Sequence, residues 1–258
     1  MSDIDTTEGG GAERVVTAAM LVIGDEILSG RTKDKNIGFV ADRLTEIGVD
    51  LKEVRIVPDE QDRIVEAVRA LSERWDLVFT SGGIGPTHDD ITADAVAAAF
   101  GVGIDIDPRA ETILRRRLEG RAEINEARLR MARIPFGADL IEPENGMPGF
   151  RIGNVHVMAG VPAVLEAMMR VVVPTLDHGR PMLSETIDAG MGEGVIATPL
   201  GAVQKAHPET VIGSYPYERD GRYATNLVVR ARDPRVLAAA VADVRAMLDD
   251  VRNARAAR

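Results

Sequence analysis

The sequence predicts an α/β protein in which a three-layer domain with a mostly parallel sheet is followed by a small α+β domain. Apolar, strand-like runs alternate with amphipathic helical segments over the first two thirds of the chain. The order of elements then changes after a turn-rich segment at 177–181. A chain of 258 residues can hold one medium and one small domain. We expect these domains at 14–178 and 182–258.

The first domain alternates strands with helices. Val15–Ile23 is a continuous apolar run, typical of a strand buried on both faces. Asn36–Ile47 repeats apolar residues at helical spacing, and Gly48 follows where a C-cap glycine is expected. Asp59 is placed to cap the next helix. The other predicted elements are strands at 49–57, 76–81, 140–141, 150–152 and 155–158, and helices at 64–75, 92–100, 108–119, 122–131 and 161–176.

The second domain has a different element order, and the N-terminus has a different composition. Residues 1–13 are rich in small and polar residues and are expected to form a flexible tail. The predicted elements of the second domain are strands at 183–189, 211–215 and 223–231, and helices at 194–206 and 234–251.

Composition excludes several classes of function. The net charge of −10 and the low aromatic content of 3% disfavour binding to nucleic acids, which takes positive charge and stacking side chains. The chain has no cysteine, which excludes disulfides, a thiol nucleophile and zinc–thiolate sites and fits a cytoplasmic location. The acidic N-terminus lacks the features of a signal peptide, and no apolar stretch is long enough to span a bilayer. We therefore expect neither nucleic acid nor membrane as a partner.

Two loops leave the carboxyl ends of predicted strands, where open α/β sheets bind their ligands. The loop at 82–92, here called the glycine loop, begins with Gly82, Gly83 and Gly85, which allow tight turns and close approach to a ligand. Its successive amides predict an anion-binding concavity, to which the hydroxyls of Ser81 and Thr87 add hydrogen-bond donors. It matches neither a Walker loop nor a dinucleotide fingerprint, and a purely structural turn is the alternative.

Carboxylates lie beside this predicted phosphate site. Asp89 and Asp90 would repel a phosphate unless a divalent cation bridged them. The other loop, 24–36, adds Asp25, Glu26 and Asp34 at the same sheet edge, where they could hold a metal or position a water.

Each of these polar residues also has a structural interpretation. One of the two aspartates in the glycine loop could cap the helix at 92–100, and Asp34 or Asn36 could cap the helix that starts near 36. His88 is a candidate general base, although a single loop histidine is more often incidental. His156 alternates within an apolar strand and is expected to be structural.

Several spaced motifs resemble one known family. They are Gly24–Gly30, Asp34-x-Asn36, the glycine loop Gly-Gly-x-Gly-Pro-Thr-x-Asp-Asp-x-Thr, Asn145–Phe150 and Gly160–Pro162. In this order they resemble the amino-terminal domain of competence/damage-inducible protein A (CinA), which is similar to the molybdopterin-binding domain of the molybdenum-cofactor biosynthesis proteins MoaB and Mog. The resemblance covers about residues 15–175, and the small α+β unit resembles the second domain of that family.

The resemblance implies a three-layer α/β fold whose ligand cleft lies at these loops. Family members are assigned either pterin binding or metal-dependent hydrolysis of ADP-ribose-like pyrophosphates. A divalent metal (Mg, Mn or Co) and molybdopterin are the implied ligands, and a homo-oligomer, most simply a dimer, is the implied assembly. The expected catalytic residues are Asp90, Asp89, Asp25 and Glu26. The expected ligand-binding residues are Ser81, Gly82, Gly83, Gly85, Thr87, Thr92, Asn36 and Asn145. The expected metal-binding residues are Asp90, Asp89 and Asp34.

The chain departs from the family at some positions. Lys35 stands where the family usually has threonine, and Ala163-Val164 stand where it has a basic residue and a glutamate. Longer members carry a carboxyl-terminal amidohydrolase domain acting on pyridine nucleotides, for which the residues up to Arg258 leave no room, so that activity is expected to be absent.

Three hypotheses for the function remain. They are a metal-dependent pyrophosphatase, a molybdopterin-binding protein with or without adenylyl transfer, and a noncatalytic nucleotide-binding module. The Pro-Thr-x-Asp-Asp form of the loop is closer to the CinA branch, which favours the first or the third.

Overall fold

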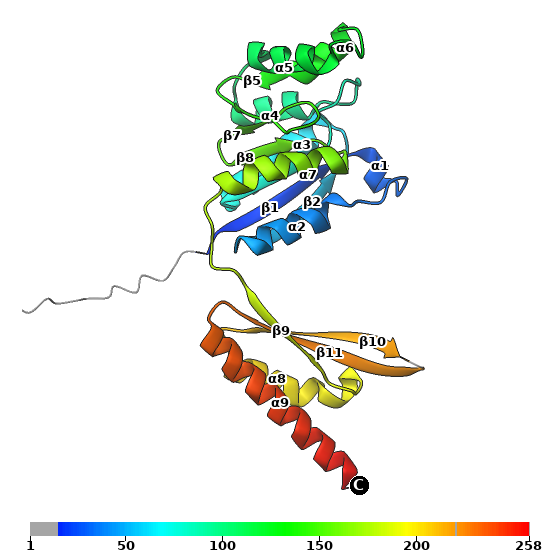
Figure 1. The fold of residues 1–258 in the computed structure, drawn as a ribbon, viewed down its shortest axis with the longest axis vertical. Helices are drawn as coiled ribbons and strands as arrows, with labels where there is room; N and C mark the ends of the chain where they lie inside the picture. The colour runs from blue at the N-terminus through cyan, green and yellow to red at the C-terminus, as the bar shows by residue number, and fades with distance from the viewer. Residues whose placement is uncertain (1–14, 220, 258) are drawn as a thin grey trace, which may run out of the picture. The chain divides into compact units, whose positions relative to one another are not determined.

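The computed structural model describes residues 15–219 and 221–257. The tail predicted at 1–13 lies outside these residues. The chain divides into two compact units, the first ending at Gly179 and the second beginning at Arg180 (Figure 1).

The first unit is built on a six-stranded sheet with the order β2-β1-β3-β8-β7-β6. The four strands β2, β1, β3 and β8 run parallel, whereas β7 is antiparallel to β8 and β6 is antiparallel to β7. The predicted mostly parallel sheet is confirmed. The strands are β1 (Thr17–Ile23), β2 (Asp50–Val57), β3 (Leu77–Ser81), β6 (Asp139–Ile141), β7 (Gly149–Ile152) and β8 (Val155–Met158).

Helices cover both faces of this sheet, which confirms the three layers (Figure 1). Strand β1 shows why, because Ala18, Met20 and Val22 face one apolar cluster and the residues between them face the other. One cluster includes α2 (Asn36–Glu46) and α7 (Pro162–Val172), which continues as a 3₁₀ turn at Val173–Thr175. The other includes α3 (Gln61–Arg74), α4 (Thr92–Phe100) and α5 (Pro108–Leu118).

The segment from 122 to 135 differs from the prediction of one helix at 122–131. Asn125 accepts a hydrogen bond from the amide of Arg128, so the helix starts late, as α6 (Glu126–Leu129). A 3₁₀ turn, η1 (Arg130–Ala132), then leads into β5 (Arg133–Pro135). Strand β5 pairs antiparallel with β4 (Ile104–Ile106), and both strands were missed because three residues carry too little periodic pattern.

Two details near the first loop also differ from the sequence prediction. The loop contains one helical turn, α1 (Asp25–Leu28). Asp59 does not cap α3, whose N-cap position is Glu60 without a side-chain hydrogen bond. The carboxylate of Asp59 instead accepts a 3.0 Å hydrogen bond from the amide of Asp25 and thereby joins the first loop to the segment between β2 and α3.

The second unit is a small α+β domain, as predicted. Its antiparallel sheet has the order β10-β11-β9, and two helices pack on it around buried residues such as Leu227, Val229 and Val244. Among the described residues no helix is long and apolar enough to cross a membrane. The elements are β9 (Leu183–Asp188), α8 (Glu193–Ala206), β10 (Val211–Arg219), β11 (Arg222–Ala231) and α9 (Pro234–Ala256).

Candidate functional site

The glycines of the glycine loop are required by contacts within the protein. Gly82 and Gly83 have φ angles of 111° and 67°, which side-chain-bearing residues rarely adopt. A Cβ on Gly82 would lie 2.1 Å from the carbonyl oxygen of Ile23, and one on Gly83 would lie 2.1 Å from Oγ1 of Thr92. The tight turn therefore follows from packing at the sheet edge and needs no ligand to explain it.

Thr92, at the start of α4, closes the glycine loop. Its side chain is fully buried, and its Oγ1 donates a 3.0 Å hydrogen bond to the carbonyl oxygen of Gly82. Its backbone amide donates to the carbonyl oxygen of Gly83, also at 3.0 Å. Two carbonyl groups that follow β3 are thus satisfied by one residue, which fixes the helix against the loop.

Asn36 ties the glycine loop to two further segments. It is 5% exposed, and its Nδ2 donates 2.8 Å hydrogen bonds to Oγ of Ser81 and to the carbonyl oxygen of Gly160. The start of α2, the end of β3 and the turn after β8 therefore meet at one amide group. Asn36, Ser81 and Thr92, which the sequence predicts as ligand-binding residues, all hold the loop in place, and their contact with a ligand stays a prediction.

The two aspartates of the glycine loop have different surroundings. The carboxylate of Asp90 accepts hydrogen bonds from Oγ1 of Thr87 and, at 2.8 Å, from its amide. Gly85 leaves room for this carboxylate, since a Cβ there would lie 2.6 Å from Oδ2 of Asp90. Asp89 is exposed, and the Thr87 side chain, with the loop backbone, lowers the pKa of Asp89 below its usual value. Neither aspartate caps α4, which has no side-chain cap, so the capping interpretation is wrong.

An acidic cluster forms where the two loops meet. Burial, and then the charges of Asp25, Glu26 and Asp89, raise the pKa of Asp59 above its ordinary value. Three of the predicted carboxylates are thus brought together around a fourth that sequence reasoning assigned only to capping. The position of Asp59 in the sequence could have predicted this role. Asp59 follows β2, whose carboxyl end lies at the same edge of the sheet as those of β1 and β3.

Other predicted residues lie apart from this cluster or serve the fold. The carboxylate of Asp34 accepts a 2.8 Å hydrogen bond from the amide of Ile37 in the first turn of α2, in agreement with the structural interpretation. Asn145 is exposed and lines a separate depression beside Arg116, Arg117 and Arg121. In the part of the chain that the structure describes, no three His, Asp or Glu side chains are placed to hold a metal ion together.

The histidines offer no general base inside the pocket. The side chain of His88 is 98% exposed, and its Nδ1 lies 3.9 Å from Oδ1 of Asp89. His156 is buried within β8 and stacks on Phe79 with 5.1 Å between the ring centroids. Burial, with a smaller effect of the nearby Arg151 charge, lowers the pKa of His156 to about 4, so the ring is neutral at pH 7. His156 is therefore structural, as expected.

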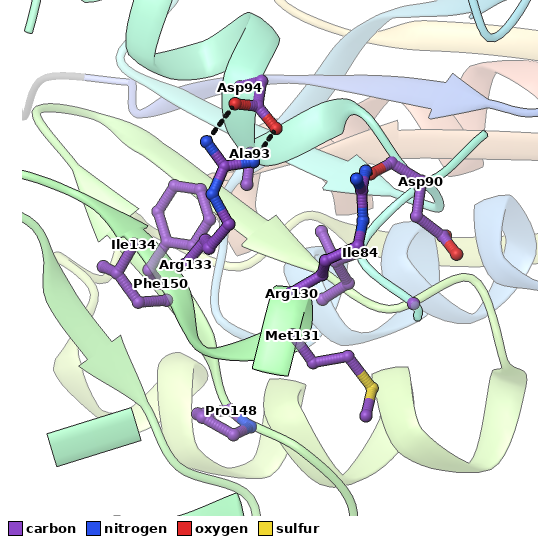
Figure 2. A pocket seen from close by; sticks show the side chains of 12 residues that line it. Ile84, Asp90, Ala93, Asp94, Arg130, Met131, Arg133, Ile134, Pro148 and Phe150 are labelled. Carbon is purple, nitrogen blue, oxygen red and sulfur yellow. Dashed lines mark hydrogen bonds and ion pairs between the residues drawn. The ribbon is translucent and has the colours of Figure 1, made fainter. Parts of the chain in front are cut away.

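A pocket lies beside the glycine loop (Figure 2). Its volume is about 20 Å³, which is roughly the room for one water molecule. Gly83, Ile84 and Gly85 line it, and their backbone amides have no hydrogen-bond partner in the described part of the chain. The other residues that line it are Asp90, Ala93, Asp94, Arg130, Met131, Arg133, Ile134, Pro148 and Phe150.

Arg130 and Arg133 are pocket residues that sequence reasoning missed. Nothing in the sequence singled out either residue, but both η1, which begins at Arg130, and β5, which begins at Arg133, contribute to the lining of the pocket beside the glycine loop. Unpaired amides on one side and arginine side chains on the other are suited to an anion.

Residues 19–178 match the family model described as "Probable molybdopterin binding domain". The chain belongs to this family. Its second unit, at 181–255, matches the model described as "FAD synthase, middle domain". The glycine loop, the acidic cluster and the pocket therefore all lie within the molybdopterin-binding-type domain.

Individual relatives agree with this assignment. A protein of Archaeoglobus fulgidus is 32% identical over 198 residues, which are 76% of this chain and 84% of that protein. One of Pyrobaculum arsenaticum is 35% identical over 210 residues, 77% of this chain and 79% of that protein. The crystal structure of CinA from Thermoplasma acidophilum, a protein of unknown function, is similar with a TM-score of 0.58 and 34% identity, over 62% of this chain and 98% of that one. The resemblance to CinA is confirmed.

Proposed function

We propose that this protein is a metal-dependent hydrolase of nucleotide pyrophosphates such as ADP-ribose. The observation that carries the proposal is a pocket lined by Asp90 and by Gly83, Ile84 and Gly85, three successive residues whose backbone amides have no partner among the described residues. Successive amides without partners can bind phosphate oxygens through their partial positive charges.

The proposed divalent cation would take only two carboxylates from the protein. Burial raises the pKa of Asp59, and the negative charges of Asp25, Glu26 and Asp89 raise it further. A bound cation would relieve the part that comes from these charges. Oxygen ligands suit Mg²⁺ and Mn²⁺, and Mg²⁺ is commonly held by one or two carboxylates together with the substrate phosphates. Asp89 and Asp90 are the residues that would hold the metal beside the bound phosphates. A bound divalent ion would neutralise pyrophosphate charge and lower the pKa of an attacking water.

The remaining polar residues orient the Asp90 carboxylate and restrain the glycine loop. The hydrogen bonds from Thr87 hold the Asp90 carboxylate at the mouth of the glycine loop. Asn36 and Thr92 keep the loop in one shape, so its amides point at a fixed position. Fixed donors next to developing negative charge stabilise a transition state without reorganisation.

The choice of a dinucleotide as substrate has support from the second unit. It matches the middle domain of FAD synthase, an enzyme named for a dinucleotide whose two halves are joined by a pyrophosphate. FAD therefore belongs in the substrate panel beside ADP-ribose and NAD.

The test is cleavage of ADP-ribose, FAD and NAD with Mg²⁺, Mn²⁺ or Co²⁺ and with a chelator. We expect metal-dependent release of AMP. Asp90→Asn preserves the acceptor for Thr87 but removes the charge, and should lower turnover by about 100-fold, equivalent to about 2.7 kcal/mol of transition-state stabilisation. Asp42→Asn, on the exposed side of α2, is the matched control and should keep full turnover. Full turnover in the Asp90→Asn variant, or no cleavage with any metal, would contradict the proposal.

A second candidate is molybdopterin binding. It is favoured by the description of the family model that covers the first unit. A pterin added to the same panel tests it: saturable pterin binding without nucleotide cleavage would select this function, and nucleotide binding without turnover would select a noncatalytic module. The homodimer and the cytoplasmic location stay predictions.

A further inference from the structure

The two arginines of the pocket differ in how they are paired. Arg133 forms a two-pronged ion pair with Asp94 of α4, with both N–O distances at 2.7 Å (Figure 2). Arg130 has no carboxylate partner among the described residues. Its guanidinium donates one 3.4 Å hydrogen bond to the backbone carbonyl oxygen of Asp90, and its Nε is buried without a partner.

This arrangement leaves the cation of Arg130 poorly satisfied. A hydrogen bond of 3.4 Å lies beyond the usual range of about 2.7–3.2 Å and is correspondingly weak. A buried N–H of a charged group without an acceptor is unfavourable, because its desolvation is not compensated. Among the described residues, no carboxylate therefore pairs with Arg130, although Asp90 and Asp94 also line the pocket.

The turn that carries Arg130 is fixed in place by its neighbours. It begins the turn η1, whose next residues enter the apolar cluster through Ala132 and Ile134, both buried. The Arg133–Asp94 pair fixes β5 to α4, which itself starts at the glycine loop. Arg130 thus extends from an anchored turn toward the glycine loop. Figure 2 shows its side chain beside Ile84 and Asp90.

We propose that Arg130 is the phosphate-binding cation of this site and selects ligands that carry a phosphate or diphosphate. This inference rests on the proposed function, whose ligand class it specifies. A phosphate would accept from the amides of Gly83, Ile84 and Gly85 on one side and from the Arg130 guanidinium on the other. The weak bond to the Asp90 carbonyl oxygen would be exchanged for charge-assisted bonds to the phosphate.

The test is calorimetric binding of inorganic pyrophosphate, ADP and adenosine to the full chain, with and without Mg²⁺. Wild type should bind the first two and should not bind adenosine measurably. Arg130→Gln should weaken both by at least tenfold, which is about 1.4 kcal/mol. Arg128→Gln is the matched control, since it removes the same charge two residues away on α6 outside the pocket, and should change affinity by less than twofold.

Thermal unfolding verifies that each variant is folded. If Arg130→Gln does not fold, Arg130→Met keeps the length of the apolar stem and is measured in its place, with the same tenfold loss expected. Affinity for pyrophosphate within twofold of wild type in the folded variant, or wild type that binds adenosine as tightly as ADP, overturns the proposal. Absence of cleavage with every metal overturns only the hydrolase, because the binding measurements need no turnover.

Discussion

Exchanging the amide of Asn36 for a carboxylate tests how the glycine loop is anchored. Asn36→Asp has nearly the same shape but lacks the N–H groups that now reach Ser81 and the carbonyl oxygen of Gly160 at 2.8 Å. The Ser81 hydroxyl can rotate and donate to the new carboxylate. The Gly160 carbonyl cannot donate, so a charged oxygen faces it in a site that is only 5% exposed at wild-type Asn36.

The magnitude follows from these contacts. A buried carbonyl left without its donor is unfavourable by about 1–3 kcal/mol, and burial of the charge adds to this. We expect a loss of about 3 kcal/mol in unfolding free energy near pH 7. The folded-state pKa of the new carboxyl is raised above its unfolded value of about 3.9, so the loss is present above the folded pKa. It shrinks as pH falls below that pKa, because the protonated carboxyl can donate to Gly160.

The assay is urea unfolding of the first unit between pH 4 and pH 8. Asn154→Asp is a matched control, because Asn154 also donates from Nδ2 to two carbonyl oxygens, those of Ser72 and Trp75, but does so away from the loop. Both variants should be less stable at pH 7, whereas only Asn36→Asp should also weaken pyrophosphate binding. If Asn36→Asp unfolds like wild type at pH 7, the anchoring role assigned to this residue is refuted.

Three further predictions concern the first unit. Gly82→Ala should lower the unfolding free energy by about 2–4 kcal/mol because the new Cβ meets the carbonyl oxygen of Ile23, whereas Gly101→Ala, in open space, should lower it by only about 1 kcal/mol. Equal losses in urea unfolding would show that the contact with Ile23 is not the cause. Because the pKa of His156 is about 4, the unfolding free energy of the wild type should fall by about 3 kcal/mol between about pH 6.5 and pH 4, where only the unfolded ring takes up a proton. His156→Phe should flatten this pH profile, and an unchanged profile would contradict the burial of a neutral ring. Asp107→Ala should lose about 1 kcal/mol because Asp107 caps α5, and an unchanged melting temperature would argue against that cap.

The sequence predicted the parts of the fold that carry strong periodic patterns. Strand β1 is buried on both faces along nearly its whole length, so its apolar run was unambiguous. The acids of the two loops were predicted to meet because parallel strands end at one edge, and Asp25, Glu26 and Asp89 do lie around Asp59.

Other parts of the site could not be predicted, for physical reasons. Arg130 and Arg133 reach the pocket through a 3₁₀ turn and a three-residue strand, which are too short to show a period. The roles of Asn36 and Gly83 were ambiguous for another reason. A polar residue or a glycine at a sheet edge can serve either to bind a ligand or to hold the backbone. Only its contact partners in the structure distinguish the two roles.

The internal anchoring of the glycine loop has a thermodynamic consequence for any ligand. A flexible loop loses about 1–2 kcal/mol of backbone entropy per residue when a ligand orders it. Here Ile23, Thr92 and Asn36 order the loop when the chain folds, so the site is preorganised and affinity reports the direct contacts with the ligand. A substitution that frees the loop without touching the pocket therefore acts at two stages, first on the free energy of unfolding and then, through entropy, on the affinity for the ligand.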